Sequence, residues 1–488
     1  MTQSSVEPKT TAEDAGSGSR TPAGRSWLDR YFHISERGST VATEVRGGVT
    51  TFMAMAYILL LNPLILSGKD VDGHLLSQPA LITATALAAA ATTLLMGFWG
   101  KVPLALAAGL SVSGVMASQV VPVMTWPQAM GMSVAYGAVI CLLVVTGLRE
   151  MIMNAIPLAL KHAITIGIGL FIAIIGFVKA GFVHENPAPG GGPVSLGPAG
   201  ELQGWPVLIF AFTLLLIFAL QARNIPGAIL IGIVAGTVVA VVLNAVADIP
   251  AKAWFSGPPE LDGSAVSAPD FSLIGEVSFK GWGDVGYITI TMIVFTLVLA
   301  GFFDAMATIL GVGTEAKLAD DKGRMPGLSK ALFIDGAGGI VGGGVGASGQ
   351  TVFVESATGV GEGARTGLAS VVTGGFFALC LFFTPLTAIV PQEVAAAALV
   401  VIGSMMMQNA KHVDWSDRSV AIPVFLTVVL MPFTYTITTG VAAGVISYAV
   451  IKTAQGKARE VGAFMWGLTA IFVVYFAIHP IESWLGVG

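Results

Sequence analysis

Charged residues are scarce in this chain of 488 residues: they make up 11% of it, whereas an ordinary soluble domain carries roughly 25%. Hydrophobic residues make up 54%, and the mean hydropathy is +0.81. With 24 Lys and Arg and 29 Asp and Glu, the chain lacks the charge that would cover a soluble surface of this size. The composition therefore excludes a water-soluble enzyme and predicts a protein embedded in the lipid bilayer.

Cysteine and histidine are also scarce, which limits the chemistry that the chain can perform. The two cysteines, Cys141 and Cys380, lie in apolar runs, so neither a disulfide framework nor a thiolate metal site is expected. All six histidines lie in tails, loops or the ends of apolar stretches. An enzyme within the membrane would need a nucleophile with its base, or a metal site, at membrane depth. We therefore expect no enzyme, no metal, no cofactor and no nucleic-acid partner.

The N-terminal region is polar, unlike the rest of the chain. Residues 1–25 are rich in Ser, Thr and Gly and predict a disordered cytoplasmic tail. Residues 26–46 mix aromatic and charged side chains and predict an amphipathic segment at the membrane surface. The membrane-embedded part is expected to begin at Gly47.

From there the sequence is a series of apolar stretches, and a helix needs about 20 such residues to cross a bilayer. Fourteen spans are predicted, seven in a first repeat (47–246) and seven in a second (286–453), with an extracytoplasmic loop at 247–285 between them. The C-terminal segment 454–488 holds a further apolar stretch, 462–479, which reads equally as a span or as an interfacial helix. The predicted spans are 48–67, 79–99, 105–121, 128–147, 157–179, 205–222, 226–246, 286–311, 329–345, 347–361, 366–389, 391–408, 418–434 and 435–453.

The basic residues give this map an orientation, because cytoplasmic loops carry an excess of Lys and Arg. With the N-terminus inside, 20 of the 24 basic residues fall on the cytoplasmic side. The four on the other side are Lys69, Lys179, Lys252 and Lys280. This asymmetry predicts a multi-pass protein of the cytoplasmic (inner) membrane with its N-terminus inside.

An odd number of spans in each half gives the two halves opposite orientations. The third span of each half, 102–121 and 344–361, is rich in glycine and interrupted, and Pro157 and Pro391 head the two fifth spans. Paired broken spans in inverted halves point to the binding site of a secondary transporter. The alternative is that the glycines only allow helices to pack closely.

Ionisable residues within spans are costly and therefore informative. Three acids lie there: Asp304, Asp335 and Glu355. In an interrupted span a carboxylate can accept hydrogen bonds from a ligand N–H and can take up a proton. Glu355 and Asp304 are therefore predicted to bind substrate and couple protons, with Thr308 one turn after Asp304 on the same face. For Asp335 we expect a structural role, which is also the alternative for the other two.

Polar and aromatic neighbours extend the predicted site. The Gln350 amide can both donate and accept, which matches the edge of a nucleobase, and the Phe353 ring could stack on a flat heterocycle. Ser111 and Ser113 offer hydroxyl groups at the corresponding break in the first half. Each of these side chains could instead serve ordinary packing.

Four stretches carry a family resemblance that extends from about residue 28 to 480. They are GGVTTFMAMAYILLLNPLILS (47–67), TGLREMIMNAIPLALKHAITIGIGLFIAIIGF (146–177), FFDAMATILGV (302–312) and VFVESATGVGEGARTGLASVVTGGFFALCLFFTPL (352–386). The chain resembles the AzgA-like purine permeases of the nucleobase/cation symporter group, in the nucleobase-ascorbate transporter superfamily. The segment that contains Glu355 is the most specific of the four.

The resemblance implies an all-α polytopic fold of 14 transmembrane spans, arranged as a 7+7 inverted repeat with short strands in spans 3 and 10. It implies a core domain (spans 1–4 and 8–11) that moves against a gate domain (spans 5–7 and 12–14). It also implies import of purines such as hypoxanthine, guanine, adenine or xanthine, driven by a proton gradient. The family's carboxylates fall on Asp304 and Glu355, and a homodimer is possible because dimers are common in the wider group.

Three departures from the family pattern lie near the expected site. Residues 301–308 read GFFDAMAT, where the family pattern is close to DLFDTIGT. Ser113 stands where the family has Asn, and Gln350 replaces an apolar residue. These changes predict an altered preference among substrates.

A second interpretation keeps the same scaffold but gives it an anion such as sulfate or a carboxylate as its cargo. Such a site would offer Arg, Lys or bare helix N-termini to the anion. The predicted spans contain no cation at mid-membrane depth, which favours the nucleobase.

Overall fold

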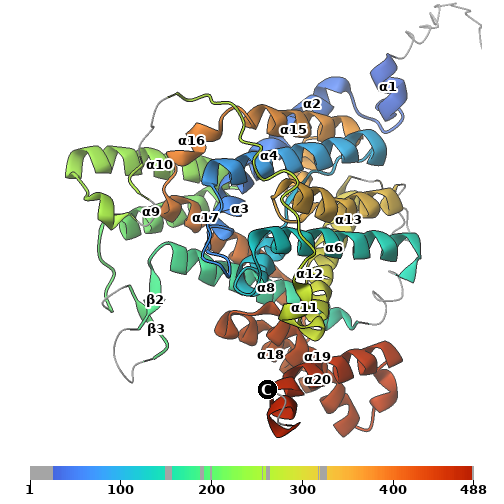
Figure 1. Cartoon of the computed structure of the whole chain (residues 1–488). Helices are drawn as coiled ribbons and strands as arrows, with labels where there is room; N and C mark the ends of the chain where they lie inside the picture. Colours follow the sequence, from blue (N-terminus) through green and yellow to red (C-terminus); the bar gives the residue numbers. More distant parts are fainter. Residues whose placement is uncertain are drawn as a thin grey trace, which may run out of the picture.

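The computed structural model describes residues 26–148, 156–186, 192–197, 200–254, 257–259, 264–316, 318 and 327–485, so the predicted tail at 1–25 lies outside the described part. Helices dominate the structure (Figure 1). Those of the first half are α1 (Trp27–Phe32), α2 (Val41–Met55), α3 (Ile58–Ile65), α4 (Gln78–Leu95), α5 (Leu110–Val115), α6 (Trp126–Val145), α8 (Leu158–Lys179), α9 (Trp205–Ala222) and α10 (Ala228–Ala247). Those that follow are α11 (Trp282–Val285), α12 (Tyr287–Glu315), α13 (Leu328–Val345), α14 (Ser356–Gly361), α15 (Gly367–Cys380), α16 (Thr384–Ala388), α17 (Gln392–Met406), α18 (Arg418–Thr434), α19 (Ile437–Ala454) and α20 (Ala463–Leu485).

Shorter elements continue or connect these helices. They are the π-helices η1 (Met96–Gly100) and η2 (Met116–Val120), the 3-10 helices η3 (Ala251–Ala253), η4 (Met407–His412) and η5 (Ala458–Glu460), and the strands β1 (Leu106–Ala108), β2 (Val183–Glu185), β3 (Val194–Leu196) and β4 (Gln350–Val352). Strands β2 and β3 pair as an antiparallel hairpin that projects from the helices (Figure 1). This hairpin is not predicted from the sequence.

The predicted surface segment, 26–46, contains both a separate short helix and the start of the first long one. Helix α2 begins at Val41, six residues before the predicted start of the folded body at Gly47, because the Thr40 side chain caps its first turn. In that turn Glu44 is fully buried and accepts hydrogen bonds from the backbone N–H groups of Arg365 and Thr366. These contacts explain why the helix starts within a polar stretch.

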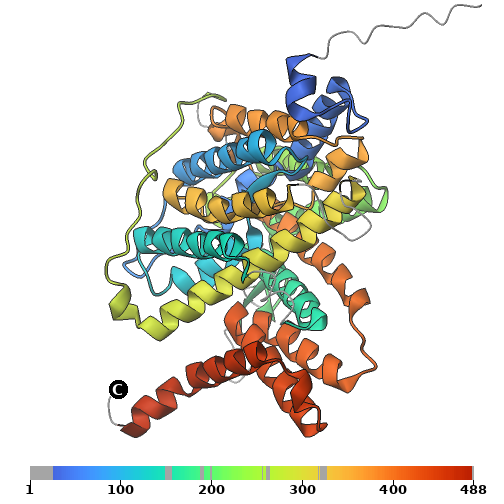
Figure 2. The ribbon, with the colours of Figure 1, turned by 90° about the vertical axis from the view of Figure 1, so that its right-hand side faces the viewer.

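The helices pack into two groups, each drawn from both halves of the chain. In the first group α6 packs on α13, α15 packs on α4 and α2, and α12 packs on α6 and α5. In the second group α17 packs on α8 and α9, α18 packs on α19 and α8, and α10 packs on α9. We call these the first and second helix groups. Figures 1 and 2 both show α4 beside α15 and α6 beside α13, although each pair is far apart in sequence.

Glycines set the closest approaches within each group. A Cβ atom on Gly339 of α13 would lie 2.7 Å from the Cα atom of Gly137 on α6. In the second group, a Cβ atom on Gly403 of α17 would collide with the carbonyl oxygen of Gly169 on α8. Small residues at such crossings let helix backbones approach in a membrane. Close packing therefore accounts for several of the glycines that the sequence concentrates in its apolar stretches.

The lengths of the helices can be compared with the predicted spans. Within the described residues, eight helices are long and apolar enough to cross a membrane. Two of the predicted spans are interrupted: the third is built from β1, α5 and η2, and the tenth from β4 and α14. Helix α20 covers the C-terminal apolar stretch, packs on α19, and extends away from the other helices in Figure 2. The count of fourteen and the role of 462–479 stay predictions.

The two interrupted segments meet in an antiparallel strand pair, as the resemblance implies. Leu106 pairs with Val352, Ala107 with Thr351, and Ala108 with Gln350, and all six residues are buried. The loop before β4 is tightly turned: Gly346 ends α13 with φ of 85°, a left-handed conformation that favours glycine.

Side chains from neighbouring helices satisfy the outer edge of each strand. The Thr93 hydroxyl of α4 accepts from the Leu106 N–H (2.9 Å) and donates to the Leu106 carbonyl (2.8 Å). The Asp335 carboxylate of α13 accepts from the Val352 N–H (3.1 Å) and from the Thr351 hydroxyl (2.9 Å). Leu106 and Val352 are register partners. Each half of the chain therefore supplies a side-chain acceptor for the backbone N–H group at the same position of the strand pair. The structural role expected for Asp335 agrees with this geometry.

Candidate functional site

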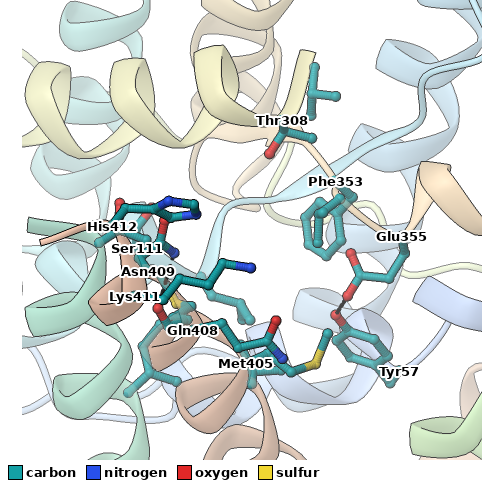
Figure 3. Close-up of a pocket in the computed structure, with 17 residues that line it drawn as sticks. Tyr57, Ser111, Thr308, Phe353, Glu355, Met405, Gln408, Asn409, Lys411 and His412 are labelled. Atoms are coloured by element: carbon teal, nitrogen blue, oxygen red, sulfur yellow. Dashed lines mark hydrogen bonds between the residues drawn. The ribbon is translucent and has the colours of Figure 1, made fainter. Parts of the chain in front are cut away.

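A cavity of about 370 Å³ lies between the two helix groups (Figure 3). Small-molecule pockets typically measure roughly 300–1,000 Å³, so this volume suits a compact ligand. The first helix group lines it with Tyr57, Leu110, Ser111, Thr308, Val352, Phe353, Val354 and Glu355. The second lines it with Thr165, Ile172, Ile402, Met405, Met406, Gln408, Asn409, Lys411 and His412.

Glu355 provides the carboxylate of this cavity. It stands at the N-cap position of α14, three residues after β4 ends, and its side chain is half-buried. The hydroxyl group of Tyr57 donates a hydrogen bond to Oε1 of Glu355. Tyr57 is 1% exposed and lies at the break between α2 and α3. The carboxylate is thus oriented by a buried donor from the first span and faces the cavity, as Figure 3 shows.

Three other predicted site residues also line the cavity. Phe353 lies between β4 and Glu355, and its backbone N–H donates to the Ala105 carbonyl (3.0 Å), which fixes the segment. Ser111 comes from the first turn of α5, and Thr308 from α12. With Tyr57, the wall formed by the first helix group thus combines two aromatic rings, three hydroxyl groups and a carboxylate.

The opposite wall is polar and carries a cation. It is formed by η4, where α17 ends, and by the facing turns of α8. Nδ1 of His162 lies 3.3 Å from Oδ1 of Asn409, and the His162 and His412 rings stack with centroids 5.2 Å apart. The ammonium group of Lys411 extends into the cavity (Figure 3). Lys411 follows the twelfth predicted span, 391–408, so the sequence alone does not place it near the site.

Ser113 and Gln350, which were predicted to bind substrate, belong to buried polar clusters within the first helix group. The Ser113 hydroxyl donates to Oδ1 of Asn62 (2.7 Å) and lies 2.9 Å from the Ser348 hydroxyl. The Gln350 side chain is 1% exposed and donates from Nε2 to the Ser348 carbonyl (3.1 Å). Two of the three departures from the family pattern therefore sit in the scaffold that holds β1 and β4.

Asp304, the second predicted carboxylate, belongs to α12, but its side chain lies outside the described part of the structure. Thr308, four residues later, does line the cavity. The structure therefore brings together Glu355, Phe353, Ser111 and Thr308 of the seven predicted residues.

Sequence reasoning missed Tyr57, Gln408, Asn409 and Lys411. Tyr57 had a signal, because a tyrosine inside a long apolar run needs a partner for its hydroxyl group. The other three lie at the end of the predicted span 391–408 or just after it, and look like ordinary interfacial polar residues. As regards metals, the described residues contain no group of three or more His, Cys, Asp or Glu side chains that could hold an ion.

Comparison with known proteins identifies the family. The family model described as "Permease family" (Xan_ur_permease) matches residues 42–443. The guanine/hypoxanthine permease PbuG of Bacillus subtilis is 36% identical over 92% of this chain and 99% of its own length. The adenine permease AdeP of Escherichia coli is 34% identical over 93% of this chain and 96% of its own length.

Solved structures of lower sequence similarity share the fold. The transmembrane domain of the cyanobacterial bicarbonate transporter BicA aligns with a TM-score of 0.58 at 17% identity and covers 82% of this chain and 97% of that domain. The inward-facing murine anion transporter Slc26a9 aligns with a TM-score of 0.61 at 12% identity, over 92% of this chain and 77% of that one. The fold is therefore the helical, multi-span fold of these inverted-repeat transporters. The resemblance to the AzgA-like permeases is confirmed: the chain belongs to this permease family, as a multi-pass membrane transporter and not an enzyme.

Proposed function

We propose that this protein imports purine nucleobases across the cytoplasmic membrane together with protons. The single observation that carries the proposal is the setting of Glu355: a carboxylate oriented by Tyr57, next to the Phe353 ring, in a cavity between two helix groups. The relatives that match over their full length are named as adenine and guanine/hypoxanthine permeases. A purine offers ring N–H donors for the carboxylate and a flat face for the aromatic ring.

In this proposal Glu355 and Asp304 both bind substrate and carry the coupled proton. A carboxylate that gains a proton gives up its charge and becomes a hydrogen-bond donor, so protonation and substrate binding influence each other. The spacing of four residues puts Asp304 on the helix face that also carries Thr308. Ser111 and Thr308 supply hydroxyl groups, and Ser113 and Gln350 support the strands from behind.

We assign the first helix group to the core domain and the second to the gate domain, with the N-terminus in the cytoplasm. The cavity lies between the groups and takes lining residues from both. Movement of the core against the gate would carry the Glu355 wall and the bound purine across the membrane in an elevator-type step. This arrangement accounts for a site whose carboxylate, Glu355, lies next to a broken segment of the first helix group and faces the second.

The test is uptake of radiolabelled hypoxanthine, guanine and adenine by cells that produce Glu355→Gln. Because a hydrogen bond to a charged group contributes about 1.5–3 kcal/mol, we expect apparent affinity to fall about ten- to a hundredfold while the protein still reaches the membrane. Glu362→Gln is the matched control, since Glu362 lies seven residues on and pairs with Arg46 (2.9 Å) instead of lining the cavity. Full-rate uptake by Glu355→Gln would contradict the role of this carboxylate.

Transport of an anion such as sulfate or a carboxylate is the second candidate, and the ammonium group of Lys411 in the cavity favours it. Competition separates the two functions. If anions displace labelled purine poorly and are not themselves accumulated, the nucleobase function stands; strong accumulation of an anion without purine uptake would replace it.

A further inference from the structure

The cavity has two walls of opposite hydrogen-bonding character. On the first helix group, Glu355 in its ionised form can only accept hydrogen bonds. On the second, the ammonium group of Lys411 can only donate them. Figure 3 shows the Lys411 side chain reaching from η4 into the space in front of Phe353, with Glu355 beyond it. A ligand that fills this space meets an acceptor on one side and a cationic donor on the other.

Lys411 is available for such a contact. Its side chain is exposed, and within the described chain it forms no ion pair with a carboxylate. Its neighbours on the same wall are the amides of Gln408 and Asn409. An amide can turn either its oxygen or its nitrogen toward a ligand, so these two side chains accept either kind of purine edge. Only Lys411 offers a donor and nothing else.

Purine bases differ in the exocyclic groups that would face Lys411 and the second helix group. Hypoxanthine, guanine and xanthine carry an exocyclic carbonyl oxygen, which accepts hydrogen bonds. Adenine carries an exocyclic amino group in place of that carbonyl, and an ammonium group facing it finds no acceptor there. A purine that carries the carbonyl therefore gains a charge-assisted hydrogen bond from the ammonium group, whereas with adenine the exposed ammonium group stays hydrated and this bond is not formed.

We propose that Lys411 is a specificity-determining residue that makes this cavity select oxopurines over adenine. The inference rests on the proposed function and adds the substrate class to it. Glu355 accepts from a ring N–H, Lys411 donates to the exocyclic oxygen, and Phe353 packs on the ring between them. The residue that reads the exocyclic group thus comes from the second helix group, whereas the carboxylate comes from the first.

The experiment measures binding of hypoxanthine, guanine and adenine to the purified full-length protein by scintillation proximity, in wild type, Lys411→Met and Lys411→Arg. We expect wild type to bind hypoxanthine and guanine at least about tenfold more tightly than adenine, the effect of one charge-assisted hydrogen bond. Lys411→Met should lose that preference because oxopurine affinity falls while adenine affinity stays. Lys411→Arg should keep it. Lys457→Met, an exposed lysine beyond α19 and outside the cavity lining, is the control and should behave like wild type.

Two results would overturn the role of Lys411: adenine binding to wild type as tightly as hypoxanthine, or an equal loss of all three bases in Lys411→Met. A wild type that binds none of the three would instead overturn the proposed function, and with it the role of Lys411. Retained adenine binding by Lys411→Met shows that the site is intact in that variant, and Lys457→Met shows the effect of losing an exposed lysine elsewhere.

Discussion

At the scale of single residues, the pair formed by Tyr57 and Glu355 is the most specific feature of the site. Tyr57 is the N-cap residue of α3, just after the end of α2, and its hydroxyl group donates to a carboxylate 298 positions later in the sequence. The tyrosine is almost fully buried, so its donor has few alternative partners. It therefore holds Oε1 of Glu355 in place at the cavity.

Tyr57→Phe should weaken substrate binding without unfolding the protein. The substitution keeps the ring and removes only the hydroxyl group, so packing is conserved while Glu355 loses its orienting donor. A neutral hydrogen bond contributes about 0.5–1.5 kcal/mol, which predicts an affinity loss of roughly two- to tenfold. The measurement is hypoxanthine affinity of the purified variant.

Tyr31→Phe is the matched control for this variant, because the Tyr31 hydroxyl donates to the Phe98 carbonyl (3.0 Å) away from the cavity. Unchanged affinity in Tyr57→Phe, or equal losses in both variants, would show that the hydrogen bond to Glu355 does not serve binding.

A site residue is easiest to predict from the sequence where its side chain is unusual for the segment that contains it. A carboxylate inside an apolar run is costly, so Glu355 stood out by itself. Gln408 and Lys411 are ordinary where they occur, at the end of a predicted span and just after it. They become significant only because η4 brings them to the same cavity as residues far away in sequence. Gln350 shows the opposite case, since a polar side chain beside Glu355 points into the scaffold.

At the scale of elements, the β1–β4 strand pair connects the two interrupted spans and supports the site. Asp335 is the acceptor for β4, and its carboxylate is 4% exposed. Asp335→Ala would leave the Val352 N–H and the Thr351 hydroxyl without this acceptor. An unsatisfied buried polar group costs about 1–3 kcal/mol, so we expect a clearly lower thermal-unfolding temperature in detergent.

Asp335→Asn retains one acceptor oxygen and should lie between Asp335→Ala and wild type in unfolding temperature. If Asp335→Ala were as stable as wild type but transported no purine, Asp335 would serve transport and not the strand.

The elements themselves were only partly predictable. Long apolar helices such as α8 and α10 match their predicted spans to within a few residues, because composition alone defines them. Strands of three residues leave no periodic pattern to read, so β1 and β4 were expected only from the family resemblance. The break at Tyr57 and the hairpin of β2 and β3 also depend on contacts that local sequence does not specify.

At the scale of the whole molecule, the proposed transport cycle requires the two helix groups to slide past each other. Met53 on α2 and Gly227 at the start of α10 face each other across the boundary between the groups, outside the cavity lining. A Cβ atom on Gly227 would lie 3.8 Å from Cβ of Met53, close to the mean of about 3.8 Å in disulfides.

We expect a Met53→Cys, Gly227→Cys protein, with Cys141 and Cys380 replaced by alanine, to lose purine uptake on oxidation and to regain it on reduction. Cysteine at Gly227 is strained, because φ there is 70°, but this strain is the same in both redox states. The measurement is uptake into vesicles, with mass spectrometry to establish the disulfide. Undiminished uptake by the fully oxidised protein would exclude a relative movement of the two groups.

The positions of the long apolar helices were accessible from sequence, since hydropathy defines them, whereas the orientation inferred from Lys and Arg stays a prediction. Which spans touch was not accessible. The pairing of α6 with α13 and of α8 with α17 depends on glycines such as Gly137 and Gly403, whose partners are found only in three dimensions. Helix length also limits the count of spans, because broken segments do not register as continuous helices.

The pairing of β1 with β4 has a consequence for how the protein is made. Residues 106–108 leave the ribosome long before residues 350–352. Until β4 has been translated, β1 lacks the strand with which it pairs. A nascent chain that ends before Gln350 can insert its first helices but cannot possess a binding site. The first helices can therefore insert before the chain can bind a ligand, because the second wall of the cavity, which ends at His412, is translated later still.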